Sequence, residues 1–361
     1  MSGEIPDSTN VELPITDEIR DIIDVRTSAQ TPVSGPAGMT ILNVTDLKMY
    51  FPVTKGLLKR TVGFVKAVDG VSFTIRNGET FGIVGESGSG KTTLGHCVIR
   101  NYRQTAGQVL YKGRELSELG KKEMRALRRE ITLITQDPYA SLNPRMSVRD
   151  IILEGPEIHG ILRSAAGRRD LVSQMLELVG LNRAYANRYP HEFSGGQRQR
   201  VSIARALALN PAFIVCDEVV SALDVSIQSQ IIGLLQSIQE KLGVTYVFIG
   251  HDLSVVRHIS NHIAVMYLGK FMELTDSDRL YDNPLHPYTK ALISAAPIPD
   301  PEIDRARQRI ILKGDIPSPI DPPKGCGFCT RCNLADKRCE NEAPEFRDVG
   351  GGHYVACFKV H

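Results

Sequence analysis

The sequence has no apolar run that approaches the roughly 20 residues that a membrane-spanning helix needs. Its longest apolar stretches are short and strand-like, such as those at 213–216 and 244–250. The chain also begins with a polar, acidic segment that lacks the apolar core of a secretory leader. We therefore expect a chain that does not cross a membrane itself and that works in the cytosol.

A strong excess of one charge is also missing. The 43 Lys and Arg residues nearly balance the 41 Asp and Glu residues, and the basic residues do not form one block. Composition therefore gives no support for a nucleic-acid-binding surface, and no nucleic-acid partner is expected. The length of 361 residues is enough for one large domain and a smaller appendage.

Changes in composition divide the chain. Residues 1–38 combine Pro, Ser, Thr and Gly with few large apolar residues, which predicts a flexible N-terminal extension. From 39 to 275, strand-like and helical patterns alternate, which predicts an α/β core with a largely parallel sheet. The pattern between 146 and 195 is helical and predicts an inserted helical subdomain. Proline becomes frequent from about 275, so 276–361 is expected to form a C-terminal domain.

The segment GESGSGKT at 85–92 has the complete form of a phosphate-binding loop between a strand and a helix. Its glycines let successive N–H groups curl around phosphate oxygens, and the helix directs its positive end to the same charge. Lys91 is expected to reach the β- and γ-phosphates of ATP, and Thr92 to bind Mg²⁺. The nucleotide-binding residues expected in this segment are Gly85, Glu86, Ser87, Gly88, Ser89, Gly90, Lys91, Thr92 and Thr93.

A second pattern, FIVCDE, places Asp217 and Glu218 at the end of an apolar strand, where carboxylates are costly unless they have a task. Beside a phosphate loop, Asp217 suits the outer Mg²⁺ shell, and Glu218 suits the general base that polarises the attacking water. The two motifs together define only a phosphate-loop NTPase, a class that includes helicases, kinases and recombinases.

The segment FSGGQ at 193–197, which precedes a helical pattern, narrows the class. Here the sequence resembles the ATP-binding subunits of ABC transporters, whose signature loop has this form. The resemblance implies an ABC-type core with an antiparallel β subdomain, the helical subdomain and a small Cys-containing C-terminal domain. It also implies that Ser194, Gly195 and Gly196 cap the γ-phosphate of ATP held by the opposite subunit, with Gln197 in the same loop.

The other motifs of the family follow in order. By resemblance, Gln136 touches Mg²⁺ and the attacking water and couples the site to the membrane subunits, while His251 contacts the γ-phosphate. Asp224 is implied to act across the dimer interface. The family also supplies an aromatic side chain to adenine; Phe51 is favoured over Tyr50, although both also fit plain packing in a sheet core.

Several phrases resemble the oligopeptide and dipeptide importer branch in particular. They include TQDPYASLNPRMSV, YPHEFSGGQRQR and NPLHPYTKALISAAPIPDP, and the wording VSALDVSIQ is closer to the second of the two ATPase subunits that such importers carry. The resemblance spans about 40–361. One departure is Val219, where the family often has proline, and it leaves the acidic pair intact.

The resemblance implies a subunit that binds and hydrolyses ATP to power peptide import. Its expected partners are a second ABC ATPase in a heterodimer, two transmembrane permease subunits and an extracellular substrate-binding protein, which places it peripherally on the cytoplasmic face of the membrane. The same motor could instead import nickel chelates or sugars. A soluble ABC ATPase usually carries two cassettes or a long coiled-coil insertion, and this chain has neither. Glu218 and His251 weigh against a subunit that binds ATP without hydrolysing it.

Five of the seven cysteines lie in the last 36 residues, which in a cytosolic chain suggests metal rather than disulfides. By resemblance, Cys326, Cys332, Cys339 and Cys357 match the importer tail, where some members hold an iron–sulfur cluster. Four thiolates can ligate [4Fe–4S] or Zn²⁺, spacing does not decide between them, and reduced cysteines without metal are a third alternative. Cys329 stands where the family usually has histidine and is a fifth candidate ligand.

Overall fold

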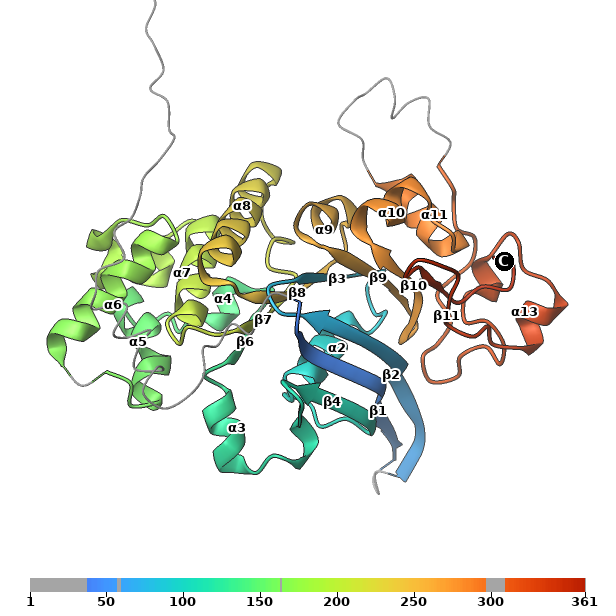
Figure 1. Cartoon of the computed structure of the whole chain (residues 1–361), viewed down its shortest axis with the longest axis horizontal. Helices are drawn as coiled ribbons and strands as arrows, with labels where there is room; N and C mark the ends of the chain where they lie inside the picture. Colours follow the sequence, from blue (N-terminus) through green and yellow to red (C-terminus); the bar gives the residue numbers. More distant parts are fainter. Residues whose placement is uncertain (1–37, 57–59, 163, 297–308, 361) are drawn as a thin grey trace, which may run out of the picture.

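The structure, a computed structural model, describes residues 38–56, 60–162, 164–296 and 309–360. The extension expected at 1–38 lies outside these residues apart from Gly38. The described residues form a four-stranded antiparallel sheet and an eight-stranded mixed sheet, so the chain has an α/β fold with both kinds of sheet (Figure 1). None of the helices in the described ranges is long and apolar enough to span a membrane.

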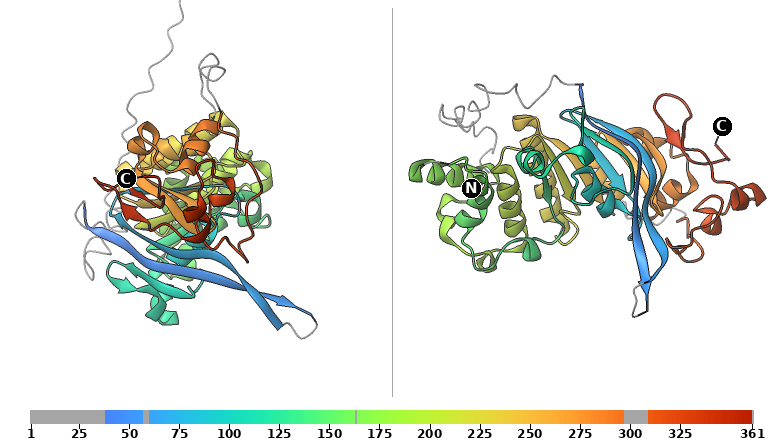
Figure 2. Two further views of the ribbon diagram at one scale, coloured as in Figure 1. Left: turned by 90° about the vertical axis from the view of Figure 1, so that its right-hand side faces the viewer. Right: turned by 90° about the horizontal axis from the view of Figure 1, so that it is seen from below.

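The antiparallel sheet has the strand order β2–β1–β4–β5. Its strands are β1 (Thr40–Lys55), β2 (Arg60–Arg76), β4 (Ala106–Tyr111) and β5 (Arg114–Glu115). In β2, Val71, Phe73 and Ile75 are buried and alternate with exposed residues, as expected for a strand with one face on the core. Strands β1 and β2 pair over nearly their whole length, and their far ends project away from the rest of the molecule (Figure 2).

The mixed sheet has the order β11–β12–β10–β9–β3–β8–β7–β6. Strands β9, β3, β8, β7 and β6 run parallel, whereas β10, β12 and β11 add antiparallel pairs at one edge. The strand bounds are β3 (Thr80–Val84), β6 (Ile131–Ile134), β7 (Phe213–Asp217), β8 (Thr245–Gly250), β9 (His262–Tyr267), β10 (Lys270–Asp276), β11 (Arg347–Asp348) and β12 (Tyr354–Val355). The carboxyl ends of β3, β7 and β8 therefore lie side by side, where open α/β sheets place their ligand sites.

Helices cover both faces of the mixed sheet, with α8 and α9 on one face and α2 between the two sheets (Figure 1). The strand β7 shows how the faces are filled, because Phe213 and Val215 pack with the α2 side while Ile214 and Cys216 pack with the α8 side. All five of its residues are buried, as is typical of a parallel strand covered on both faces. These helices are α2 (Lys91–Val98), α8 (Val225–Leu242) and α9 (Leu253–Ile259).

A group of helices lies at one end of the mixed sheet, beyond β6 (Figure 1). Within it α7 packs against α4, α5 and α6. The group consists of α4 (Pro138–Ser141), α5 (Val148–Ile158), α6 (Ala165–Leu178), η2 (Arg183–Asn187), η3 (Pro190–Glu192) and α7 (Gly195–Leu207). The short elements η1 (Leu116–Glu118) and α3 (Lys121–Leu127) lie between the antiparallel sheet and β6 in sequence.

The last part of the chain joins the edge of the mixed sheet through β12 and β11. Its helices are α10 (Ser277–Asp282), α11 (Pro287–Ala295), η4 (Cys329–Arg331) and α13 (Lys337–Asn341). Glu273 of β10 is fully buried, and its carboxylate accepts hydrogen bonds from the ring of His353 at 2.7 Å and from the backbone N–H groups of Leu285 and His286. A buried carboxylate is stable only with such partners, so this network fixes the tail to the core.

Candidate functional site

The loop after β3 has the shape that its glycines allow. Gly85 and Gly90 have φ angles of 155° and 104°, and a Cβ atom at either position would lie within 2.1 Å of a backbone carbonyl oxygen. Only glycine fits there. Helix α2 begins directly after the loop at Lys91, so its first N–H groups face the concave side where a phosphate would bind.

Lys91 is the cation of this loop and is only 4% exposed. Its Nζ donates to the carbonyl oxygens of Gly85 at 2.8 Å and Glu86 at 3.0 Å, so the ammonium lies inside the curl of the loop. Burial lowers the pKa of Lys91, while the nearby carboxylates of Glu218 and Asp217 oppose that shift. The ammonium is therefore desolvated, and an anion would be a stronger partner for it than the two carbonyl oxygens.

An acidic pair lies beside the loop, at the end of β7. The Thr92 hydroxyl donates to Asp217 Oδ1 at 3.0 Å, and Asp217 is 6% exposed. Burial raises the pKa of Asp217, and the hydrogen bond from Thr92 lowers it. A hydroxyl and a carboxylate in contact are the hard oxygen donors that Mg²⁺ takes, so these two residues fit a Mg²⁺ site.

Glu218 has a φ of 49°, a backbone conformation that non-glycine residues rarely adopt and that often marks functional sites. The Gln136 side-chain amide donates to Glu218 Oε2 at 2.8 Å, and His251 Nδ1 lies 3.9 Å from the same oxygen. The structure therefore brings these three expected catalytic side chains together, with Thr92 and Asp217 nearby. A carboxylate held at a strand end in this way can accept a proton from a water molecule.

The segment expected to be the signature loop begins helix α7. Ser194 is its N-cap, with its hydroxyl accepting from Gln197 N at 3.4 Å, while the Gln197 side chain accepts from Ser194 N at 3.1 Å. Gly196 packs so closely on Ile227 of α8 that a Cβ atom would lie 2.6 Å from it. Among the described residues, no hydrogen bond or ion pair joins this segment to the phosphate loop of the same chain. Asp224 is exposed at the start of α8.

The two aromatic candidates for adenine have different surroundings. The Tyr50 hydroxyl donates to the Asp69 carboxylate, which fixes the ring to β2. Phe51 packs edge-on against Tyr102, with ring centroids 5.6 Å apart, and Tyr102 stacks on His96 of α2. Phe51 has no polar anchor of this kind, and its ring is partly exposed.

All five C-terminal cysteines line one pocket, together with His286 and Phe328. Burial raises the pKa of Cys326 to about 11 and also raises the pKa values of Cys329, Cys332 and Cys357. Within the described ranges, however, no group of three or more His, Cys, Asp or Glu side chains is arranged to hold a metal ion. The donor atoms match a thiolate site, but their arrangement here does not form one.

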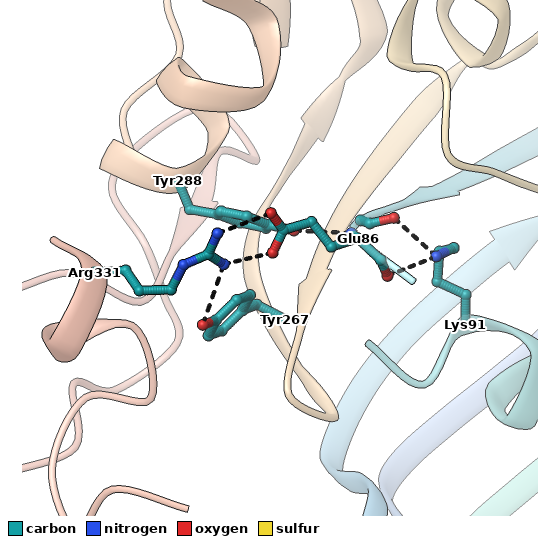
Figure 3. A network of polar contacts seen from close by, with 6 residues as sticks. Glu86, Lys91, Tyr267, Tyr288 and Arg331 are labelled. Atoms are coloured by element: carbon teal, nitrogen blue, oxygen red, sulfur yellow. Dashed lines mark hydrogen bonds and ion pairs between the residues drawn. The ribbon is translucent and has the colours of Figure 1, made fainter. Parts of the chain in front are cut away.

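One contact was not predicted from the sequence. The side chain of Glu86, inside the phosphate loop, forms an ion pair with Arg331 from the cysteine-rich tail (Figure 3). The two residues are 245 positions apart, and neither lies in a pattern that indicates the other. Only the fold brings them together.

Comparison with known proteins gives two family matches. Residues 68–221 match the family described as ABC transporter, and residues 272–339 match the one described as oligopeptide/dipeptide transporter, C-terminal region. The oligopeptide transport ATP-binding protein AppF of Bacillus subtilis is 54% identical over 319 residues, which is 88% of this chain and 97% of that protein. A putative oligopeptide transport ATP-binding protein of the same organism, YkfD, is 56% identical over 88% of this chain and 95% of its own length.

Solved structures agree with these matches. The dimeric post-hydrolysis structure of the ATP-binding cassette MJ0796, bound to ADP and Pi, is 28% identical and has a TM-score of 0.58 over 65% of this chain and 98% of that one. The cbiO1 protein of Clostridium perfringens, part of the ABC transporter complex cbiONQ, gives 25% identity and a TM-score of 0.58 over 68% of this chain and 91% of that one. The chain is an ABC ATPase and belongs to the oligopeptide/dipeptide branch of the ABC transporter family.

Proposed function

We propose that this chain is the ATP-binding and hydrolysing subunit that powers import of di- and oligopeptides across the cytoplasmic membrane. The observation that carries the proposal is the 54% identity to an oligopeptide transport ATP-binding protein over 97% of that protein's length. The match to the transporter C-terminal region at 272–339 favours this branch over a soluble ABC ATPase. Nickel chelates and sugars are the alternative cargoes.

The phosphate loop, residues 85–93, is proposed to bind the triphosphate of ATP. Lys91 already lies inside the curl of the loop, so it can exchange two carbonyl partners for the β- and γ-phosphate oxygens. The N–H groups of the loop and of the first turn of α2 add hydrogen bonds to the same anion. Phe51 is proposed to pack on the adenine, since Tyr50 is already fixed by its bond to Asp69.

Thr92, Asp217 and Gln136 are proposed to hold Mg²⁺. The contact between Thr92 and Asp217 supports this assignment, because it places two oxygen donors next to the phosphate loop. When bound, the metal ion neutralises negative charge on the β- and γ-phosphates. Asp217 then acts as the buried carboxylate that keeps the Thr92 hydroxyl oriented.

Glu218 is proposed as the general base, with Gln136 and His251 as its neighbours in catalysis. The Gln136 amide fixes one carboxylate oxygen of Glu218 and leaves the other to accept the proton of the attacking water. His251 lies on the same side and can donate to the γ-phosphate oxygen on which charge develops. The water attacks the γ-phosphorus, the bond to the bridging oxygen breaks, and ADP leaves.

The signature-loop residues Ser194, Gly195, Gly196 and Gln197 are proposed to bind the ATP of a second ABC ATPase subunit. The lack of polar contacts between this segment and the phosphate loop of the same chain, among the described residues, favours such an arrangement. Asp224 is exposed and would act at the same interface. Closure of this heterodimer would move two permease subunits, with peptide delivered by an extracellular binding protein and the chain bound at the cytoplasmic face.

The domain organisation is proposed as a nucleotide-binding domain at 39–275 and a C-terminal domain at 276–361. The mutual packing of α5, α6 and α7 supports an inserted helical subdomain at about 146–195 within the first. The convergence of five cysteines on one pocket supports a Cys-containing C-terminal domain. The extension at 1–38 is assigned no function.

This proposal predicts transport that depends on the complete complex. Purified chain, combined with the second ATPase and the two permeases in vesicles, should hydrolyse ATP faster when binding protein and peptide are added, and labelled peptide should accumulate. A matched sample with nickel chelate or sugar in place of peptide serves as the control. Stimulation by one of those solutes alone would assign another cargo, and failure to assemble with any permease would favour a soluble ATPase.

For the cysteine pocket we propose a [4Fe–4S] cluster held by Cys326, Cys332, Cys339 and Cys357, with Zn²⁺ or reduced thiols as alternatives. The proposal is supported by the shared pocket, which all four of these cysteines line. Chain purified without oxygen should be coloured and contain about four irons per molecule. A colourless sample with one zinc would assign Zn²⁺, and a sample free of both metals would leave reduced thiols.

A further inference from the structure

The carboxylate of Glu86 points away from the phosphate side of its loop and toward the cysteine-rich tail (Figure 3). It forms a two-point ion pair with Arg331, with Nη1 at 2.5 Å from Oε2 and Nη2 at 3.0 Å from Oε1. The Arg331 side chain is 8% exposed and that of Glu86 is 27% exposed. Such a bidentate and partly buried pair is stronger and more directional than an ordinary surface ion pair.

Two tyrosines complete the contact. The backbone N–H of Glu86 donates to the Tyr288 hydroxyl at 2.9 Å, and Arg331 Nη1 lies 3.5 Å from the Tyr267 hydroxyl. Both rings are buried and pack on each other and on Phe328. Glu86 is therefore held through its side chain and its N–H from the tail side, and through its carbonyl by Lys91 from the phosphate side.

The charge of Glu86 poses a problem for a triphosphate site. A carboxylate in the phosphate loop repels the phosphate charges unless a cation neutralises it, and the repulsion grows with the charge of the ligand. Arg331 is that cation, and it lies in the short turn η4 (Cys329–Arg331), next to Cys332. The same turn supplies Cys329 to the thiol pocket, so a displacement of the turn moves Arg331 as well.

We propose that Arg331 is a positioning residue of the nucleotide site, which neutralises Glu86 and holds it away from the triphosphate. The inference rests on the proposed function, since it requires that the loop binds ATP. It also gives the cysteine-rich tail a direct connection to the site. The turn η4, which contains Cys329 and is followed by Cys332, also carries Arg331, the cation on which ATP affinity depends. Without the ion pair to Arg331, the carboxylate of Glu86 would leave a negative charge in the phosphate loop without its cationic partner.

The test compares dissociation constants for ATP and ADP in the full chain by fluorescence titration. Arg331→Gln should weaken ATP binding about tenfold and ADP binding about threefold, because the exposed carboxylate acts on one phosphate fewer in ADP. Glu86→Gln should strengthen ATP binding, and adding it to Arg331→Gln should recover most of the lost affinity. Equal losses for both nucleotides without recovery in the double variant would reduce Arg331 to a structural role.

Arg338→Gln is the matched control. Arg338 forms an ion pair with Glu342 in the same tail, and this pair is far more exposed than the pair of Arg331 with Glu86. It should leave both dissociation constants within about twofold of wild type, as a surface ion pair contributes little. Thermal unfolding checks that each variant is folded. If Arg331→Gln does not fold, Glu86→Gln carries the test alone, since weaker ATP binding in that variant contradicts the electrostatic argument.

The outcome separates this inference from the proposed function. Lys91→Ala should weaken ATP binding by about 10²-fold or more if the loop is the nucleotide site, whatever the Arg331 variants do. Wild-type chain that binds no ATP would overturn the proposed function, whereas wild-type binding with an unchanged affinity in Arg331→Gln would overturn only the role of Arg331.

Discussion

Glu218→Gln should retain ATP binding and lose about 10²- to 10⁴-fold of the turnover rate, the range that a positioned general base contributes. The amide oxygen of glutamine can still accept the hydrogen bond that Gln136 donates at 2.8 Å, so the local geometry is preserved. The amide cannot take a proton from the attacking water at neutral pH. Binding and catalysis are therefore expected to separate in this variant.

The measurement is steady-state phosphate release by the assembled complex, with nucleotide retention determined on the same sample. Glu240→Gln is the matched control, because Glu240 is exposed on α8 and lies in no described contact with the site. It should hydrolyse ATP within about twofold of wild type, as surface substitutions usually have small effects. Phosphate release at the wild-type rate in Glu218→Gln would assign the base to another residue.

Parts of the site that lie in short, continuous segments could be predicted from the sequence. The phosphate loop needs glycine at positions 85 and 90, because a Cβ atom at either position would clash with a backbone carbonyl oxygen. The glycines of the motif therefore indicate the shape of the loop. Asp217 is the last residue of a fully buried strand, and the sequence shows this as an apolar run that ends in carboxylates. The family resemblance implied that Gln136 touches Mg²⁺ and the attacking water. Its direct hydrogen bond to Glu218, at 2.8 Å, is known only from the structure.

Features that depend on contacts between distant segments could not be predicted. The strands β11 and β12 contain two residues each, too few for any alternation of apolar and polar side chains. The left-handed backbone conformation of Glu218 could not be predicted from the sequence, because neither glutamate nor the valine that follows favours a positive φ angle. The pairing of Glu86 with Arg331 likewise depends on how the tail returns to the loop after β10.

The cysteines show the same limit in another form. Their crowding into the last 36 residues suggested metal rather than disulfides. All five line one pocket, but in the described residues they are not arranged to hold a metal ion. Spacing along the chain does not determine the distances between sulfur atoms, because those depend on the turn η4, on α13 and on the path of the segment after β12. The sequence therefore identifies the donor atoms of such a site without identifying the metal that they bind.

Lys91→Ala should weaken ATP binding by about 10²-fold or more, the loss expected when a unit charge is removed about 4 Å from an anion in a partly buried site. Burial lowers the pKa of Lys91, and the carboxylates of Glu218 and Asp217 oppose that shift. Without the ammonium, these two carboxylates face the triphosphate uncompensated, and the loop carbonyls that Nζ contacts lose their donor.

Nucleotide titration of the purified chain measures this loss, and thermal unfolding without nucleotide shows whether the variant is folded. The control is Lys122→Ala, since Lys122 is an exposed lysine of α3 and its removal changes the net charge by the same amount. ATP affinity near the wild-type value in Lys91→Ala would place the nucleotide elsewhere. A loss of ATP affinity in both lysine variants would instead indicate a general effect of net charge. A direct contact between the Lys91 ammonium and the triphosphate, which acts over about 4 Å, would not affect the Lys122 variant. A selective loss in Lys91→Ala identifies the ammonium inside the loop as the group that holds the triphosphate.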